Sequence, residues 1–180
     1  MWREGIPVFL LDTSVLSALT NPNHTSHTNA RAFRTQCATQ ERELYLCVIS
    51  IAEMRFGLSM YEARMPRPSE TVLNEIRERI HAAMTLSEPI EITRHVANEH
   101  GQLRSKWAWI CSPQKAAQGK LKGNPPERWS DDWPASKLQI TENDIWIAAI
   151  ALTHDLTLVT CDKDFDNLAK ADSQLKILRI

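Results

Sequence analysis

The feature that most constrains this chain is a set of short apolar runs, each followed by an acidic residue at the expected start of a helix. The segments are FLLDTSVL, CVISIAEM, ITENDIWIAAIAL and LTLVTCDKDF, and their acids are Asp12, Glu53, Asp144 and Asp162. Short apolar runs that alternate with helical patterns predict parallel strands joined by helices. Because such strands end along one edge of a sheet, we expect the four carboxylates to gather at that edge.

The rest of the pattern continues this alternation. The expected strands are 7–12, 44–50, 157–160 and 176–180, with a brief strand or a turn at 91–93. The expected helices are 14–20, 28–41, 51–60, 69–86, 94–110, 140–155 and 164–170. The helix at 140–155 is almost wholly apolar, so we expect it at the centre of the fold. The predicted fold class is α/β with a central parallel sheet.

Length and composition indicate one ordinary globular domain. The chain has 180 residues, which predicts a single domain over 1–180 with an insertion or long loop at about 104–138. No apolar run approaches the roughly 20 residues that span a bilayer, and the N-terminus lacks the pattern of a signal peptide. We therefore expect a cytoplasmic protein without membrane segments. Its four cysteines are scattered, which predicts free thiols rather than disulfides.

The segment at 104–138 differs from the rest in charge and aromatic content. Seven basic and three acidic residues lie between Arg104 and Lys137, interleaved with four tryptophans, although the whole chain has a net charge of −1. One interpretation is a solvated loop whose tryptophans attach it to the domain. The other is a flap that contacts RNA or a partner, with Lys115, Lys120 and Lys122 facing phosphates.

Each acid also has a purely structural interpretation. Ser50 with Glu53, and Thr141 with Asp144, fit the capping-box pattern of a helix start. Asp12 and Asp162 could likewise cap the helices that follow them.

The acids taken together indicate something more. Two carboxylates about 4 Å apart repel by roughly 4 kcal/mol at an effective dielectric constant near 20, so a cluster requires a cation or a proton. Ligands that are all carboxylates favour Mg²⁺ or Mn²⁺. The histidine pairs His24/His27 and His95/His100 are poorly spaced for zinc.

Four segments resemble the PIN-domain ribonucleases, specifically the VapC-type toxins of bacterial toxin–antitoxin pairs. They are LDTSVLSAL (11–19), SIAEMRFGL (50–58), NDIWIAAIAL (143–152) and LTLVTCDKDFDNL (156–168), and they occur in the family's order. The resemblance implies a Rossmann-like three-layer α/β/α fold. It also implies an acidic site with Mg²⁺ or Mn²⁺ and the cleavage of RNA phosphodiester bonds.

The resemblance also implies roles for individual residues. Asp12, Glu53 and Asp144 correspond to three core acids, and the fourth is Asp162 or, two residues later, Asp164. Asp12, Asp144 and Asp162 would hold the metal, while Glu53 would be a ligand or a base that orients water.

Polar neighbours at the same helix starts would support these acids. They are Thr13, Ser14, Asn143 and Thr160, which would hold acids or water by hydrogen bonds. The chain departs from small toxins of this type in the long segment before the helix NDIWIAA.

The family implies two partners besides RNA, namely a small antitoxin and a second copy of the chain. Two other function classes remain open. A catalytically silent RNA-binding or regulatory domain would keep the fold without needing the acids. A phosphatase or response-regulator-like domain would use an aspartyl phosphate. Lys163 could serve it, but the residues after Asp12 lack the second acid of the phosphatase motif.

Overall fold

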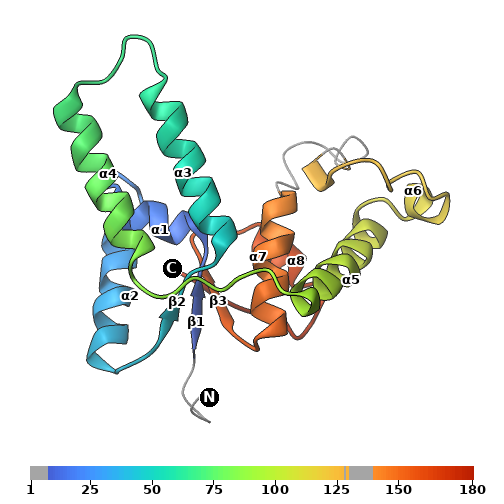
Figure 1. Ribbon diagram of the computed structural model, residues 1–180. Helices are drawn as coiled ribbons and strands as arrows, with labels where there is room; N and C mark the ends of the chain where they lie inside the picture. Colours follow the sequence, from blue (N-terminus) through green and yellow to red (C-terminus); the bar gives the residue numbers. More distant parts are fainter. Residues whose placement is uncertain (1–7, 128, 130–139) are drawn as a thin grey trace. The chain divides into compact units, whose positions relative to one another are not determined.

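The computed structural model describes residues 8–127, 129 and 140–180 (Figure 1). Four strands, β1 (Phe9–Leu11), β2 (Leu44–Tyr45), β3 (Thr157–Thr160) and β4 (Lys176–Arg179), form one parallel sheet in the order β2-β1-β3-β4. β1 pairs with β2 in the register Phe9 to Leu44 and Leu10 to Tyr45. The predicted α/β class with a parallel sheet is therefore confirmed.

Eight helices occur in the part of the chain that the structure describes. Their bounds are α1 Thr13–Thr20, α2 His27–Thr39, α3 Val48–Glu62, α4 Glu70–Met84, α5 Arg94–Cys111, α6 Pro113–Ala117, α7 Glu142–Thr153 and α8 Phe165–Leu168. No helix of this part is long and apolar enough to cross a membrane.

The chain forms two compact units. The first comprises 1–91, 159–161 and 178–180, and the second comprises 92–158 and 162–177. The expectation of a single domain over 1–180 stays a prediction.

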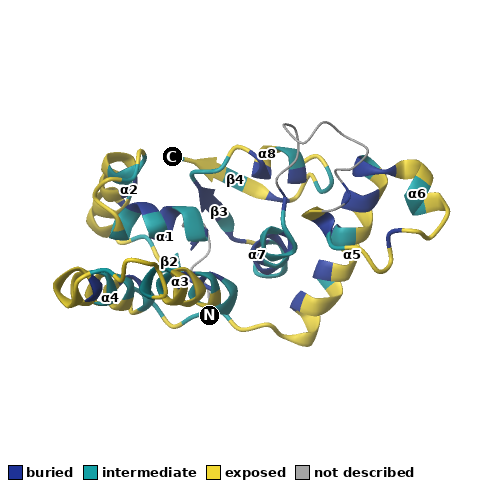
Figure 2. Ribbon diagram, turned by 90° about the horizontal axis from the view of Figure 1, so that it is seen from above, coloured by how far each residue is buried: buried dark blue, intermediate teal, exposed yellow. Residues whose placement is uncertain are grey.

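Side chains of β1, α1 and β3 form the core of the first unit. Phe9, Leu11, Val15, Leu16 and Val159 are buried there together. A short strand that is buried on both faces has a continuous run of apolar residues. This is why β1 could be predicted from the sequence. α3 and α4 contact each other in this unit, and α4 is mostly exposed (Figure 2).

The second unit is built around α7. Ile145 and the run from Ile147 to Ala151 are buried, as predicted for an almost wholly apolar helix. α7 packs against α5, which contributes the buried side chains of Leu103 and Trp107.

The second predicted strand is largely wrong. Residues 44–50 were expected to be extended, but β2 covers only Leu44–Tyr45 and α3 already begins at Val48. Between them, Cys47 forms an isolated parallel bridge with Ile90, the residue just before the expected short strand at 91–93. Val48 and Ile49 are β-branched and suggest a strand, but both lie half-buried in the first turn of α3, where the tertiary context overrides that preference.

All four cysteines are free, and Cys37, Cys47 and Cys111 are buried. The prediction of free thiols is confirmed. Burial raises the pKa of Cys111 to about 12, so this thiol is neutral at physiological pH.

Candidate functional site

Asp12 lies where β1 ends and α1 begins. It is the N-cap of α1, and its carboxylate accepts hydrogen bonds from the backbone N–H groups of Thr13 at 2.7 Å and Ser14 at 3.3 Å. A short polar side chain at this position satisfies N–H groups that have no partner within the helix. The capping interpretation of Asp12 is therefore confirmed.

Two hydroxyl groups hold the same carboxylate from the side. The Oγ of Ser14 donates to Asp12 Oδ2 at 2.6 Å, and Thr160 Oγ1 at the end of β3 donates to it at 2.9 Å. The backbone N–H of Cys161 donates to Ser14 Oγ at 3.0 Å, which fixes that hydroxyl. The sequence expectation that Ser14 and Thr160 hold an acid is met.

Asp12 is more buried than a cap needs to be, with only 4% of its surface exposed. Burial raises the pKa of this carboxyl group, although the hydrogen bonds from Ser14, Thr160 and Thr13 oppose the rise. Since burial disfavours the anion, a cation nearby would stabilise the charged form. A carboxylate with this burial and pKa is a candidate for a functional residue.

Glu53 lies close to Asp12 through one shared neighbour. Thr13 gives its backbone N–H to Asp12 and its hydroxyl to Glu53 Oε2. The first unit therefore places these two predicted site residues on either side of Thr13. The capping-box interpretation of Ser50 and Glu53 is wrong, because α3 begins at Val48 and Glu53 lies in its second turn.

In the second unit, Asp144 closes a capping box at the start of α7. Its Oδ2 accepts from the backbone N–H of Thr141 at 2.7 Å and from the Thr141 hydroxyl at 2.8 Å. The N–H of Asp144 donates back to Thr141 Oγ1 at 3.3 Å. The structural interpretation of Asp144 is thus confirmed, and the box fixes the rotamer of this side chain.

Asp162 and Asp164 are neighbours just before α8. The backbone N–H of Asp164 donates to Asp162 Oδ1 at 2.8 Å. Asp164 is buried, and its pKa is raised first by that burial and then by the charge of Asp162, while Lys163 opposes the rise. Both candidates for the fourth acid therefore lie together, and the choice between them stays open.

A network that the sequence did not reveal surrounds the start of α7. The imidazole of His100 on α5 stacks on Trp146 with ring centroids 3.6 Å apart, and its Nε2 lies 3.0 Å from a Glu142 carboxylate oxygen. The alignment of that contact falls short of a full hydrogen bond for Nε2. Arg104 also pairs with Glu142, at 3.0 Å. The spacing of His100 and Arg104, four residues apart on one helix face, was the available signal.

Trp129 anchors the part of the 104–138 segment that follows α6. It is 2% exposed, donates its indole N–H to Asn124 O at 2.9 Å and lies under the guanidinium of Arg104. Trp107 and Trp109 lie on α5 instead of a loop, the first buried and the second 53% exposed. The interpretation of a loop that a tryptophan attaches to the domain is confirmed for Trp129. The predictions for Arg128, Asp131, Asp132, Trp133 and Lys137 concern residues that lie outside the described ones.

The predicted metal site would be made of carboxylate ligands. No group of three or more His, Cys, Asp or Glu side chains that could hold a metal ion occurs within 8–127, 129 and 140–180. The acids form two neighbouring pairs instead, Asp12 with Glu53 and Asp162 with Asp164. Their oxygen chemistry suits Mg²⁺ or Mn²⁺, and the raised pKa values of Asp12 and Asp164 are those of carboxyl groups that a cation would ionise.

Comparison with known proteins gives results for both sequence and fold. A model of the PIN domain family matches residues 126–171. No curated protein matches the chain significantly. Sixteen chains of solved structures match it.

Three of those structures are described here by their sequence identity, coverage and TM-score. FitAcB from Neisseria gonorrhoeae is 21% identical, with a TM-score of 0.62 over 96% of this chain and 97% of that chain. VapBC2 from Rickettsia felis, bound to a DNA fragment from its promoter, is 17% identical, with a TM-score of 0.59 over 96% and 98%. VapBC-5 from Mycobacterium tuberculosis, of the VapBC family of toxin–antitoxin systems, is 17% identical, with a TM-score of 0.53 over 97% and 100%. The resemblance that the four sequence segments indicated is confirmed, and this chain has the PIN fold.

Proposed function

We propose that this protein is a metal-dependent endoribonuclease and the toxin of a toxin–antitoxin pair. The observation that carries the proposal is Asp12, a buried carboxylate at the carboxyl end of β1, where open α/β folds place their sites. Thr13 joins Glu53 to it, and the likeness to the PIN domain, from which RNA cleavage was expected on the sequence, supports the proposal.

Four acids would carry the reaction, chosen from five candidates. Asp12, Asp144 and Asp162 would hold Mg²⁺ or Mn²⁺, Glu53 would be a further ligand or the base that orients water, and Asp164 is the alternative to Asp162. When bound, the ion would supply positive charge opposite the phosphate oxygens and a more acidic water molecule.

The side chains around these acids position them. Ser14 and Thr160 hold one oxygen of Asp12 by their hydroxyl groups, and Thr13 holds Glu53. Thr141 fixes Asp144 in the same way. Carboxylates that are held before substrate arrives need no reorganisation during the reaction, which is how an enzyme stabilises a charged transition state.

A small antitoxin and a second copy of the chain are the proposed protein partners, and the cytoplasm is the proposed site of action. FitAcB and the VapBC proteins named above suggest such a partner. In the first unit, a cavity of about 600 Å³ lies between α1, α3 and α4, and Thr13, Glu53, Met54 and Leu58 are among its lining residues. A groove with a mixed apolar and polar lining suits an amphipathic segment of a partner, which would then cover Glu53.

The test is RNA cleavage by the purified full-length chain. We expect cleavage with Mg²⁺ or Mn²⁺, none with EDTA, and recovery when metal is returned. Asp12→Asn and Asp144→Asn should each lower the rate by several orders of magnitude, on the scale of about 10²–10³ or more that one electrostatic group supplies. Glu78→Gln, which removes an exposed acid of α4, is the matched control and should cleave normally. A folded wild-type protein that binds RNA and cuts none with any metal would instead be the catalytically silent domain.

A further inference from the structure

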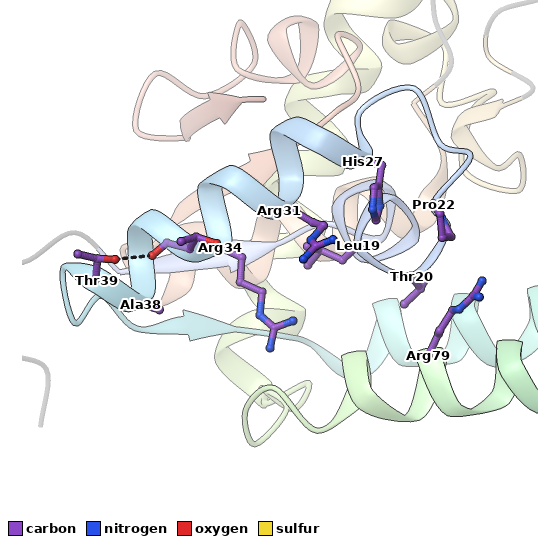
Figure 3. Close-up of a pocket in the computed structure, with 10 residues that line it drawn as sticks. Leu19, Thr20, Pro22, His27, Arg31, Arg34, Ala38, Thr39 and Arg79 are labelled. Carbon is purple, nitrogen blue, oxygen red and sulfur yellow. Dashed lines mark hydrogen bonds between the residues drawn. The ribbon is translucent and has the colours of Figure 1, made fainter.

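A second cavity of the first unit is strongly basic. It has a volume of about 590 Å³ and lies between α1, α2 and α4. Arg31 and Arg34 of α2 and Arg79 of α4 line it, together with His27, and no acidic residue of the described part of the chain does (Figure 3). Its volume falls within the roughly 300–1,000 Å³ of ligand-binding pockets. A concave surface lined by one sign of charge concentrates ions of the opposite sign.

The charges of this cavity are mostly uncompensated. Within the described part of the chain, Arg31 and Arg34 make no hydrogen bond or ion pair. Arg79 pairs only with Glu75, at 3.2 Å, and both side chains are largely exposed. Arg31 and Arg34 are three positions apart on α2, an arrangement that disfavours the helix when both carry the same charge. An anion between them would remove that repulsion.

The chemistry of the lining selects phosphate. Guanidinium groups present forked N–H donors that match phosphate oxygens. Among the described residues, no Phe, Tyr or Trp side chain lines the cavity, so these residues offer no platform on which a base would stack. His27 is held in place, because its Nδ1 lies 2.7 Å from the carbonyl oxygen of Ala18 and must donate to it. A site with this lining contacts the nucleic-acid backbone rather than the bases.

The position of the cavity identifies which phosphates it would meet. Thr20 and Arg79 line both this cavity and the one that contains Thr13 and Glu53. A strand with one phosphate at the acidic site would therefore continue past Arg79 toward α2. We propose that the Arg31–Arg34–Arg79 cavity binds the backbone phosphates of single-stranded RNA next to the bond that is cut. This inference rests on the proposed function.

The test measures RNA binding separately from cleavage. In the full-length Asp12→Asn protein, which we expect to bind RNA without cutting it, a labelled single-stranded RNA is titrated by fluorescence anisotropy at several salt concentrations. Arg31→Ala/Arg34→Ala should weaken binding at least about tenfold. The slope of the logarithm of the binding constant against the logarithm of the salt concentration should become less steep by about 0.7 for each phosphate that the protein no longer neutralises. Both side chains are exposed on a helix, where alanine is favourable, so the variant should fold. Arg67→Ala/Arg94→Ala removes the same charge from exposed sites outside the cavity and should bind nearly normally.

The outcomes separate this inference from the proposed function. If the cavity variant and the control bind RNA with equal affinity and equal salt dependence, the inference is overturned. The proposed nuclease function still holds in that case, provided that the wild-type chain cleaves RNA. Absence of both RNA binding and cleavage in the wild-type chain overturns both. Inorganic phosphate at concentrations that match the phosphates of the RNA should compete weakly. Strong displacement by free phosphate, or by an acidic peptide, would mean that the cavity serves another anion and would refute the RNA assignment.

Discussion

Replacing Asp12 by asparagine or by alanine should separate its structural role from its catalytic role. The carboxylate accepts from four donors, of which three reach Oδ2 and one reaches Oδ1. Asparagine can keep its oxygen at the three-donor position, but it would lose the bond from the Thr13 N–H and set its own NH₂ donor against that group, at a cost of about 1–2 kcal/mol. Removing a charge whose burial is unfavourable offsets part of that cost.

Alanine would lose every bond. The missing cap costs about 0.5–2 kcal/mol, and leaving the buried Thr160 hydroxyl with a poorer set of partners costs about 1–3 kcal/mol. Together these predict a loss of about 1.5–5 kcal/mol for Asp12→Ala and about 1 kcal/mol for Asp12→Asn. Urea denaturation followed by circular dichroism measures both values.

The same two proteins should behave alike in RNA cleavage, with both nearly inactive. This contrast is what distinguishes a catalytic carboxylate from a cap. An Asp12→Asn protein that cleaves RNA at the wild-type rate would show that Asp12 serves only as a cap. Equal stabilities of the two variants would refute the stabilising role assigned to the four hydrogen bonds.

Other parts of the structure can be tested by substitution, pH and chemical labelling. Thr141→Ala breaks the capping box of α7 and should lower the free energy of unfolding by about 1 kcal/mol in urea denaturation. Trp129→Ala should cost about 3–5 kcal/mol in the same assay, whereas Trp109→Ala, at an exposed position, should change stability by less than about 0.5 kcal/mol. Burial lowers the pKa of His100 below 6.5, so the unfolded chain takes up that proton first as the pH falls. The free energy of unfolding should therefore decrease as the pH drops below 6.5, and less so in His100→Gln. Cys111, with a pKa of about 12, should resist iodoacetamide in the native protein and react in denaturant, as mass spectrometry would show.

The sequence predicted elements well where local pattern and burial agree. TLVT at 157–160 is β3 as expected, and the apolar stretch beginning at residue 140 contains the buried helix α7. The error at 44–50 has a physical cause. β-Branched residues such as Val48 and Ile49 favour a strand locally, but a short apolar run also suits the half-buried first turn of a helix, and only the tertiary partners decide.

The residues of the candidate site could be named from the sequence, but the contacts between them could not. The position of Asp12 after an apolar run identified it as the end of a strand, and the structure agrees. The hydroxyl of Thr160 lies 148 residues away in sequence, so no local pattern could reveal that it donates to Asp12. The stacking of His100 on Trp146 likewise depends on how α5 packs against α7, which the helical spacing of either segment alone does not specify.

Calorimetric titration of the full-length chain with Mn²⁺ decides whether the proposed acids bind a metal ion. We expect saturable binding by the wild-type protein and by Glu78→Gln, and its loss in both Asp12→Asn and Asp144→Asn, because both aspartates are proposed metal ligands. Mn²⁺ binding that is unchanged in the two aspartate variants, or absent from the wild-type protein, would show that these carboxylates do not form a metal site.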